Sequence, residues 1–131
     1  MIVVRSLSHT QQISNVAIRE LVQQRIDDLH DDGFDLAELG YFLVVEPGDT
    51  IEAIDAQVGF PILCNRLTGL RWDQTGFTPS FELVEEFSAC FDLVYVTSDD
   101  GVGVEVFVPK SEGVDPELLA MCRRYATRGD R

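Results

Sequence analysis

The clearest structural signal in this sequence lies in residues 91–108, which read FDLVYVTSDDGVGVEVFV. Two β-branched and aromatic runs flank Ser-Asp-Asp-Gly, and Gly101 supplies the positive φ that a tight hairpin turn requires. In the second run the valines fall on alternate positions, whereas Glu105 and Phe107 face the other way. The pattern predicts an antiparallel hairpin made of residues 91–98 and 102–108.

Three segments before this hairpin also have the composition of strands. Residues 2–5 and 41–45 are short β-branched and aromatic runs. Residues 81–87 alternate in a way that suits a strand, although a helix fits them nearly as well. A strand at 81–87 would make the hairpin part of a C-terminal β-meander.

Three helices are predicted from caps and apolar spacing. A capping box at residues 8–11 is expected to start a first helix that continues to Leu29, with Gly33 as its stop. A second box at residues 49–52 opens a short helix, and Asp115-Pro116 caps the last one. We find no repeat and no linker, and the chain has the length of one domain. Residues 1–131 are therefore predicted to form a single α+β domain, with an antiparallel sheet and helices packed mainly on one face.

Charge is the unusual feature of the composition. The 131 residues include 23 acids and 10 bases, which gives a net charge of −13. Between Ile26 and Pro109 there are 18 acids, and the only bases are Arg66 and Arg71. A surface of this sign argues against direct nucleic-acid binding and against docking on anionic membranes.

The densest acidic cluster surrounds the expected end of the first helix. Carboxylates at that position oppose the helix dipole, so local stability does not explain them. A calcium loop is rejected, because Leu39 occupies the twelfth position, where a bidentate Glu is needed. A solvated face is one interpretation, and a recognition surface for a basic protein partner is the other, with mimicry of nucleic-acid phosphates as its extreme form. The candidate residues are Asp27, Asp28, Asp31, Asp32, Asp35 and Glu38.

The longest irregular segment, residues 65–80, holds a second candidate site. It combines Arg66 and Arg71 with the only tryptophan, Trp72, and Arg and Trp are enriched at binding hot spots. The structural alternative is that Trp72 covers the hydrophobic core and that the two arginines neutralise nearby carboxylates. The functional alternative is a small ligand-binding protein or enzyme with a pocket near this loop.

No motif for catalysis, metal binding or a cofactor is found. The two histidines, His9 and His30, have no metal-binding spacing, and the sequence contains neither a phosphate-binding loop nor a nucleophile elbow. The three cysteines stand far apart, which fits inert thiols in a reducing cytoplasm. We expect no catalytic residue, no metal and no cofactor.

Four segments together resemble a group of known proteins: residues 40–49, 59–63, 99–103 and 115–119. The chain resembles small acidic bacterial proteins that accompany plasmids and integrative elements, over roughly residues 40–126. This resemblance implies a bacterial, cytoplasmic, accessory role and no particular activity. The sequence thus favours a non-enzymatic module that binds a basic protein, with a homodimer that pairs sheet edges as a further alternative.

Overall fold

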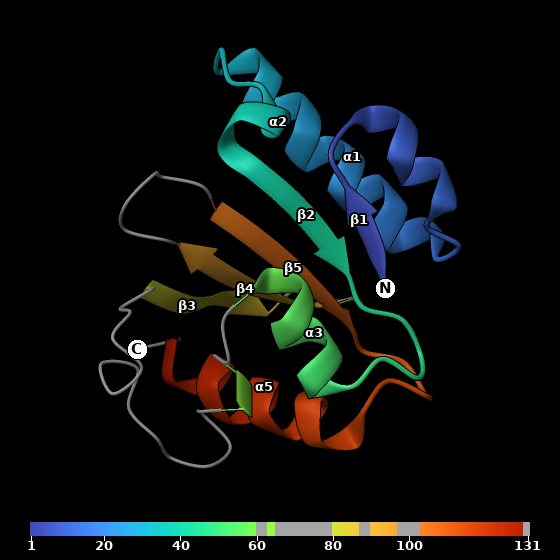
Figure 1. The fold of residues 1–131 in the computed structure, drawn as a ribbon, viewed down its shortest axis with the longest axis vertical. Coiled ribbons are helices and arrows are strands. Elements are labelled where there is room, and N and C mark those ends of the chain that lie inside the picture. The colour runs from blue at the N-terminus through green and yellow to red at the C-terminus, as the bar shows by residue number, and fades with distance from the viewer. Residues whose placement is uncertain (60–62, 65–79, 87–89, 97–102, 130–131) are drawn as a thin grey trace.

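A mixed β-sheet runs through the middle of the molecule, and helices cover both of its faces (Figure 1). The computed structural model describes residues 1–59, 63–64, 80–86, 90–96 and 103–129. Within these residues the sheet has five strands in the order β1-β2-β5-β4-β3. Their bounds are β1 Ile2–Val4, β2 Gly40–Val44, β3 Ser80–Glu86, β4 Cys90–Val96 and β5 Gly103–Pro109.

The predicted α+β class and the meander are confirmed. β3, β4 and β5 pair antiparallel in sequence order, with Cys90 opposite Pro109 and Val96 opposite Gly103 in the hairpin. The prediction of an antiparallel sheet is wrong in one respect, because β2 pairs with β5 in parallel. Between these two strands the chain passes through α3 (Ile51–Val58), β3 and β4, and β5 then runs beside β2 in the same direction. Alternation along a strand identifies its faces but not the direction of its neighbour.

The first helix starts later than predicted. Residues Leu7–Gln12 form a 3-10 helix, η1, and α1 spans Val16–Asp31. Ile13 is extended and buried between them, so the chain bends before α1 begins. The cap is Asn15, whose Oδ1 accepts a hydrogen bond from the Ile18 N–H at 3.2 Å.

The remaining helices each begin directly after a capping residue. α2 spans Leu36–Leu39, α3 spans Ile51–Val58 and α5 spans Pro116–Gly129. Thr50 Oγ1 accepts from the Ala53 N–H at 3.1 Å at the start of α3. Asp115 Oδ1 accepts from the Glu117 N–H at 2.9 Å at the start of α5. The predicted Asp115 cap of α5 is thereby confirmed, whereas the box at residues 49–52 is displaced by one residue, because Thr50 rather than Asp49 caps α3. Among the described residues, no helix is both long enough and apolar enough to cross a bilayer.

Two hydrophobic clusters lie on opposite faces of the sheet, so the prediction that helices pack mainly on one face is wrong. Tyr41, Leu43 and the alternate valines of β5 pack with α3 and α5. Phe42 and Phe107, whose rings meet edge to face at 5.6 Å, pack with α1 and α2 on the other face. Every residue of β2 is buried, which is typical of a strand covered on both sides.

Candidate functional site

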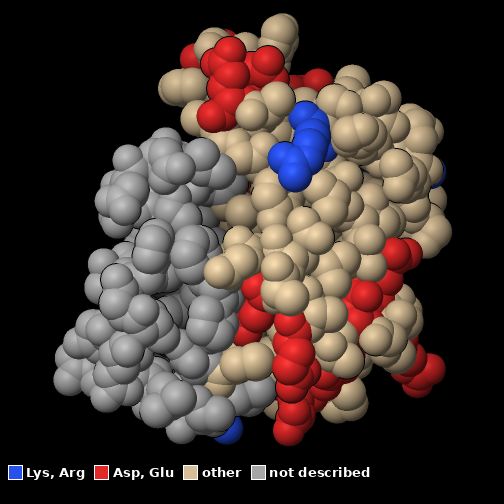
Figure 2. Space-filling view, in the orientation of Figure 1, with Lys and Arg blue, Asp and Glu red and all other residues tan. Residues whose placement is uncertain are grey.

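The six predicted carboxylates are all exposed and occupy one segment, from the last turns of α1 to α2. Figure 2 shows acidic side chains at the top of the molecule, where Figure 1 shows α2 and the end of α1. A second group of acidic side chains lies in the lower half of the same view. We call the first group the acidic end, which comprises Asp27, Asp28, Asp31, Asp32, Asp35 and Glu38.

Backbone geometry at Gly33 places the acidic end. Gly33 has a φ of 86°, and the N–H of Phe34 donates to the carbonyl of Leu29 at 2.8 Å, which closes α1 with a Schellman motif. The chain then reverses, and Asp35 caps α2 by accepting from the Ala37 N–H at 3.2 Å. The turn therefore joins the two helical segments that carry the carboxylates of the acidic end.

Few interactions with described residues offset the negative charge of the acidic end. Among the described side chains, no Lys or Arg forms an ion pair with any of its six carboxylates. Besides the Ala37 N–H at Asp35, the one described donor to these carboxylates is Gln24, whose Nε2 donates to Asp28 Oδ1 at 2.9 Å. Asp31 and Asp32 lie at the end of α1, where the helix dipole is negative. The local field is therefore strongly anionic.

An exposed aromatic side chain lies within this acidic segment. Phe34 follows Gly33 directly, precedes Asp35 and is 52% exposed, although large apolar side chains are usually buried. Sequence reasoning missed Phe34, although an aromatic residue between Gly33 and Asp35 breaks the polar character expected of a turn. The surface thus combines negative charge with one apolar contact point.

The second candidate site lies outside the described residues. Arg66, Arg71 and Trp72 fall within residues 65–79, so the predicted loop site and its pocket stay predictions.

A partly buried charge cluster joins α1 to the sheet, and sequence reasoning missed it. Arg25 Nη2 pairs with Asp92 Oδ2 at 3.0 Å, and Arg25 Nη1 pairs with Glu105 Oε1 at 3.0 Å. Asp92 is fully buried, and the side chain of Glu105 is 14% exposed. Burial and the neighbouring Asp92 raise the pKa of Glu105 to about 8, against the opposing effect of Arg25. The signal in the sequence was a single Glu at an inward position among the valines of β5.

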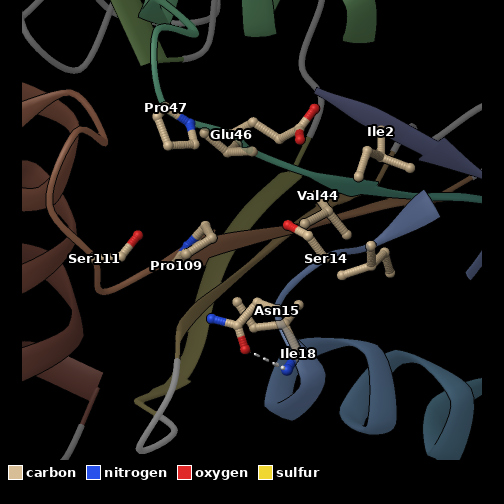
Figure 3. Close-up of a pocket in the computed structure, with 11 residues that line it drawn as sticks. Ile2, Ser14, Asn15, Ile18, Val44, Glu46, Pro47, Pro109 and Ser111 are labelled. Carbon is tan, nitrogen blue, oxygen red and sulfur yellow. Dashed lines mark hydrogen bonds between the residues drawn. The ribbon is translucent and has the colours of Figure 1, made fainter. Parts of the chain in front are cut away.

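A shallow groove of about 240 Å³ lies between the start of α1 and the ends of β2 and β5 (Figure 3). Its floor is apolar, and Ser14, Asn15 and Ser111 supply its neutral polar groups. Its one carboxylate, Glu46, lies 3.4 Å from the terminal ammonium of Met1, which Asp49 contacts at 2.7 Å. The described lining contains no His, Cys or Lys, and Glu46 is its one ionisable side chain.

The three thiols are free and poorly suited to nucleophilic chemistry. Burial raises the pKa of Cys90 and of Cys122 to about 12. Burial and Asp55 raise the pKa of Cys64 to about 11. The thiolate is the reactive form, so these residues are protonated and unreactive near neutral pH. Within the described parts of the chain, no group of three His, Cys, Asp or Glu side chains is arranged to hold a metal ion.

Comparisons with protein-family models, with curated proteins and with solved structures found no match to this chain.

Proposed function

We propose that this chain is a non-enzymatic interaction module that binds a basic protein partner through the acidic end. The observation that carries the proposal is a set of exposed carboxylates, in the segment that contains Phe34, for which no described Lys or Arg forms an ion pair. Complementary charge accelerates association and selects the partner, whereas an aromatic side chain supplies much of the contact energy. The two features together suit a partner with a basic surface and an apolar pocket.

The position of the carboxylates supports this role. A carboxylate at a helix C-terminus costs roughly 0.3–1 kcal/mol of stability before screening. Asp31 and Asp32 therefore weaken α1 rather than support it, and solubility does not require them at this position. In the extreme form of the proposal, the carboxylates imitate a phosphate array and occupy a nucleic-acid-binding site.

The cellular setting belongs to the same proposal. The resemblance to acidic bacterial proteins of plasmids and integrative elements supports an accessory role in a bacterial cytoplasm. A basic protein that acts on nucleic acid would be a suitable partner there, because its own surface must attract phosphates.

The test compares two variants of equal net charge. One replaces Asp27, Asp28, Asp31 and Asp32 by Asn, and the other replaces the exposed acids Glu20, Glu52, Glu112 and Glu117 by Gln. A protein captured from bacterial lysate by the wild type is purified, and its affinity for all three chains is measured at stepwise salt. We expect the Asp→Asn variant to lose at least tenfold in affinity and the Glu→Gln variant to stay within threefold. Equal losses, or an affinity that ignores salt, would contradict the proposal.

Phe34 is tested separately from the charges. Phe34→Ser should weaken the same complex at least fivefold without loss of stability, because the side chain is half exposed. Leu7→Ser is the matched control, since Leu7 is 48% exposed and lies in η1. If both substitutions have the same effect on affinity, Phe34 is not a specific contact.

A further inference from the structure

The last turns of α1 are packed less deeply than its first turns. Ile18 and Val22, the two buried side chains of the helix, lie in its first half. Ile26 and Leu29, in its second half, are only partly buried. These later turns carry carboxylates of the acidic end. Apolar packing therefore anchors the start of α1 more firmly than the part that presents the carboxylates.

The acidic side chains themselves weaken these last turns. Asp27 lies four residues before Asp31, so two like charges are neighbours on the surface of the helix. Asp31 and the C-cap residue, Asp32, also oppose the helix dipole. The local sequence therefore favours fraying of these turns, and their order depends on contacts with the rest of the fold.

Arg25 supplies such a contact at the boundary between the two halves of α1. Its Nη2 donates to Asp92 Oδ2 and its Nη1 donates to Glu105 Oε1, each at 3.0 Å. Asp92 belongs to β4 and Glu105 to β5, which are neighbouring strands. Two nitrogens of one planar group, held by two strands, fix the orientation of the guanidinium as well as its position. A carboxyl oxygen accepts such hydrogen bonds whether or not its group is protonated.

We propose that Arg25 is the positioning residue of the acidic end: its contacts with β4 and β5 keep the last turns of α1 helical and docked, so that the carboxylates meet a basic partner in a fixed arrangement. A surface that is ordered before binding loses less conformational entropy when the partner binds. The part that concerns binding rests on the proposed function. The part that concerns α1 needs no partner.

Charge alone and positioning by Arg25 predict opposite effects. Replacing Arg25 by a neutral residue makes the chain one unit more negative than the −13 of the wild type. If charge alone attracted the basic partner, this loss would leave the affinity unchanged or raise it. If Arg25 positions the carboxylates, the same loss lowers the affinity. Arg19 is the matched control, because it lies in the same helix and pairs with no carboxylate among the described residues.

Hydrogen exchange of the full chain tests the effect on α1 without a partner. Arg25→Lys keeps a positive charge near Asp92 but lacks the planar fork. It should lower protection at residues 27–31 about tenfold, and protection at residues 20–24 by less than about threefold. Arg25→Gln should have a larger effect in the same last turns, and Arg19→Gln should have none.

The location of the change decides between a local and a general role. A loss of protection concentrated at residues 27–31 supports the proposal. An equal loss along the whole of α1, or failure of Arg25→Lys to fold, would show that Arg25 stabilises the domain as a whole. Unchanged protection at residues 27–31 would show that the end of the helix does not need Arg25. Each of these last three results overturns the proposal.

The binding measurement uses the purified protein that the wild type captures from bacterial lysate. Arg25→Gln should bind it about fivefold more weakly than the wild type, and Arg25→Lys about threefold more weakly. Arg19→Gln should bind it no more weakly than the wild type. Equal affinities of Arg25→Gln and Arg19→Gln would overturn the part that concerns binding. If the Asp→Asn variant of the acidic end keeps the wild-type affinity, the proposed function fails, whereas the exchange result for α1 is unaffected.

Discussion

Single buried polar residues hold segments of this protein together that hydrophobic contacts alone would not align. Asp55 is the clearest example, since it is buried in α3 and accepts hydrogen bonds from two backbone N–H groups. Those groups belong to Leu63 at 3.0 Å and Cys64 at 2.9 Å. Burial raises the pKa of Asp55, and the two hydrogen bonds oppose that rise. The residue therefore anchors the chain that follows α3.

Asp55→Ala should destabilise the protein by about 2–4 kcal/mol, because two backbone donors lose their acceptor. Urea unfolding measures this change. Glu52→Gln, an exposed carboxylate in the same helix, is the control and should change stability by less than about 0.5 kcal/mol. A small effect of Asp55→Ala would mean that water replaces the carboxylate.

At the scale of elements, α1 has two sides with different roles. Ile18 and Val22 are fully buried against the sheet, and Arg25 reaches the same face. Its last turns carry carboxylates that the helix dipole disfavours. The turn at Gly33 then connects these turns to α2. One helix thus serves both the core and the proposed interaction surface.

Gly33→Val should cost about 1–2 kcal/mol of stability. The φ of 86° is unfavourable for a β-branched residue, whereas no atom lies within 4 Å of an added Cβ. Gly33→Asn should recover part of the loss, because Asn tolerates the left-handed conformation. Urea unfolding compares the two variants, and equal costs would indicate a steric clash rather than backbone strain.

Removing the charges that oppose the dipole should stabilise α1. The double variant Asp31→Asn and Asp32→Asn is expected to gain about 0.5–1 kcal/mol at low salt, and this gain should shrink as salt screens the charges. Glu117→Gln removes a carboxylate from the first turn of α5 and should have the opposite sign. Thermal and urea unfolding at two ionic strengths check both signs, and destabilisation by the double variant would show that these carboxylates have a structural role.

At the scale of the whole molecule, the sheet separates two hydrophobic clusters. Residues of β2 alternate between them, so each cluster packs against the same backbone. The β2–β5 pair is central in the sheet and contributes side chains to both faces. We expect the two clusters to fold as one cooperative unit.

Ile18→Ala and Leu118→Ala test this cooperation from opposite faces. Both side chains are fully buried, and each substitution should cost about 2–5 kcal/mol. Near- and far-ultraviolet circular dichroism should still follow one transition in urea. Separate transitions in either variant would show that the two faces unfold independently.

Local patterns predicted much of the fold. The hairpin, the short first strand, the approximate start of α3 and the cap of α5 follow from capping residues and alternation, which depend on neighbours in the chain. The start of α1 was missed because Ser8 and Gln11 have the sequence of a cap, while buried Ile13 requires a bend after them. The six acidic residues were identified from composition, and Phe34 was missed because exposure of one side chain depends on packing.

The sequence alone determined the cap of α5, the alternation in the hairpin and the charge imbalance, because these depend on residue type and on spacing along the chain. Only the tertiary structure decided that β2 lies parallel to β5, that helices cover both faces, and that Arg25 meets Asp92 and Glu105. These features join residues as many as 80 positions apart. No local preference encodes such contacts, since they form only when packing on both sides of the sheet brings the elements together.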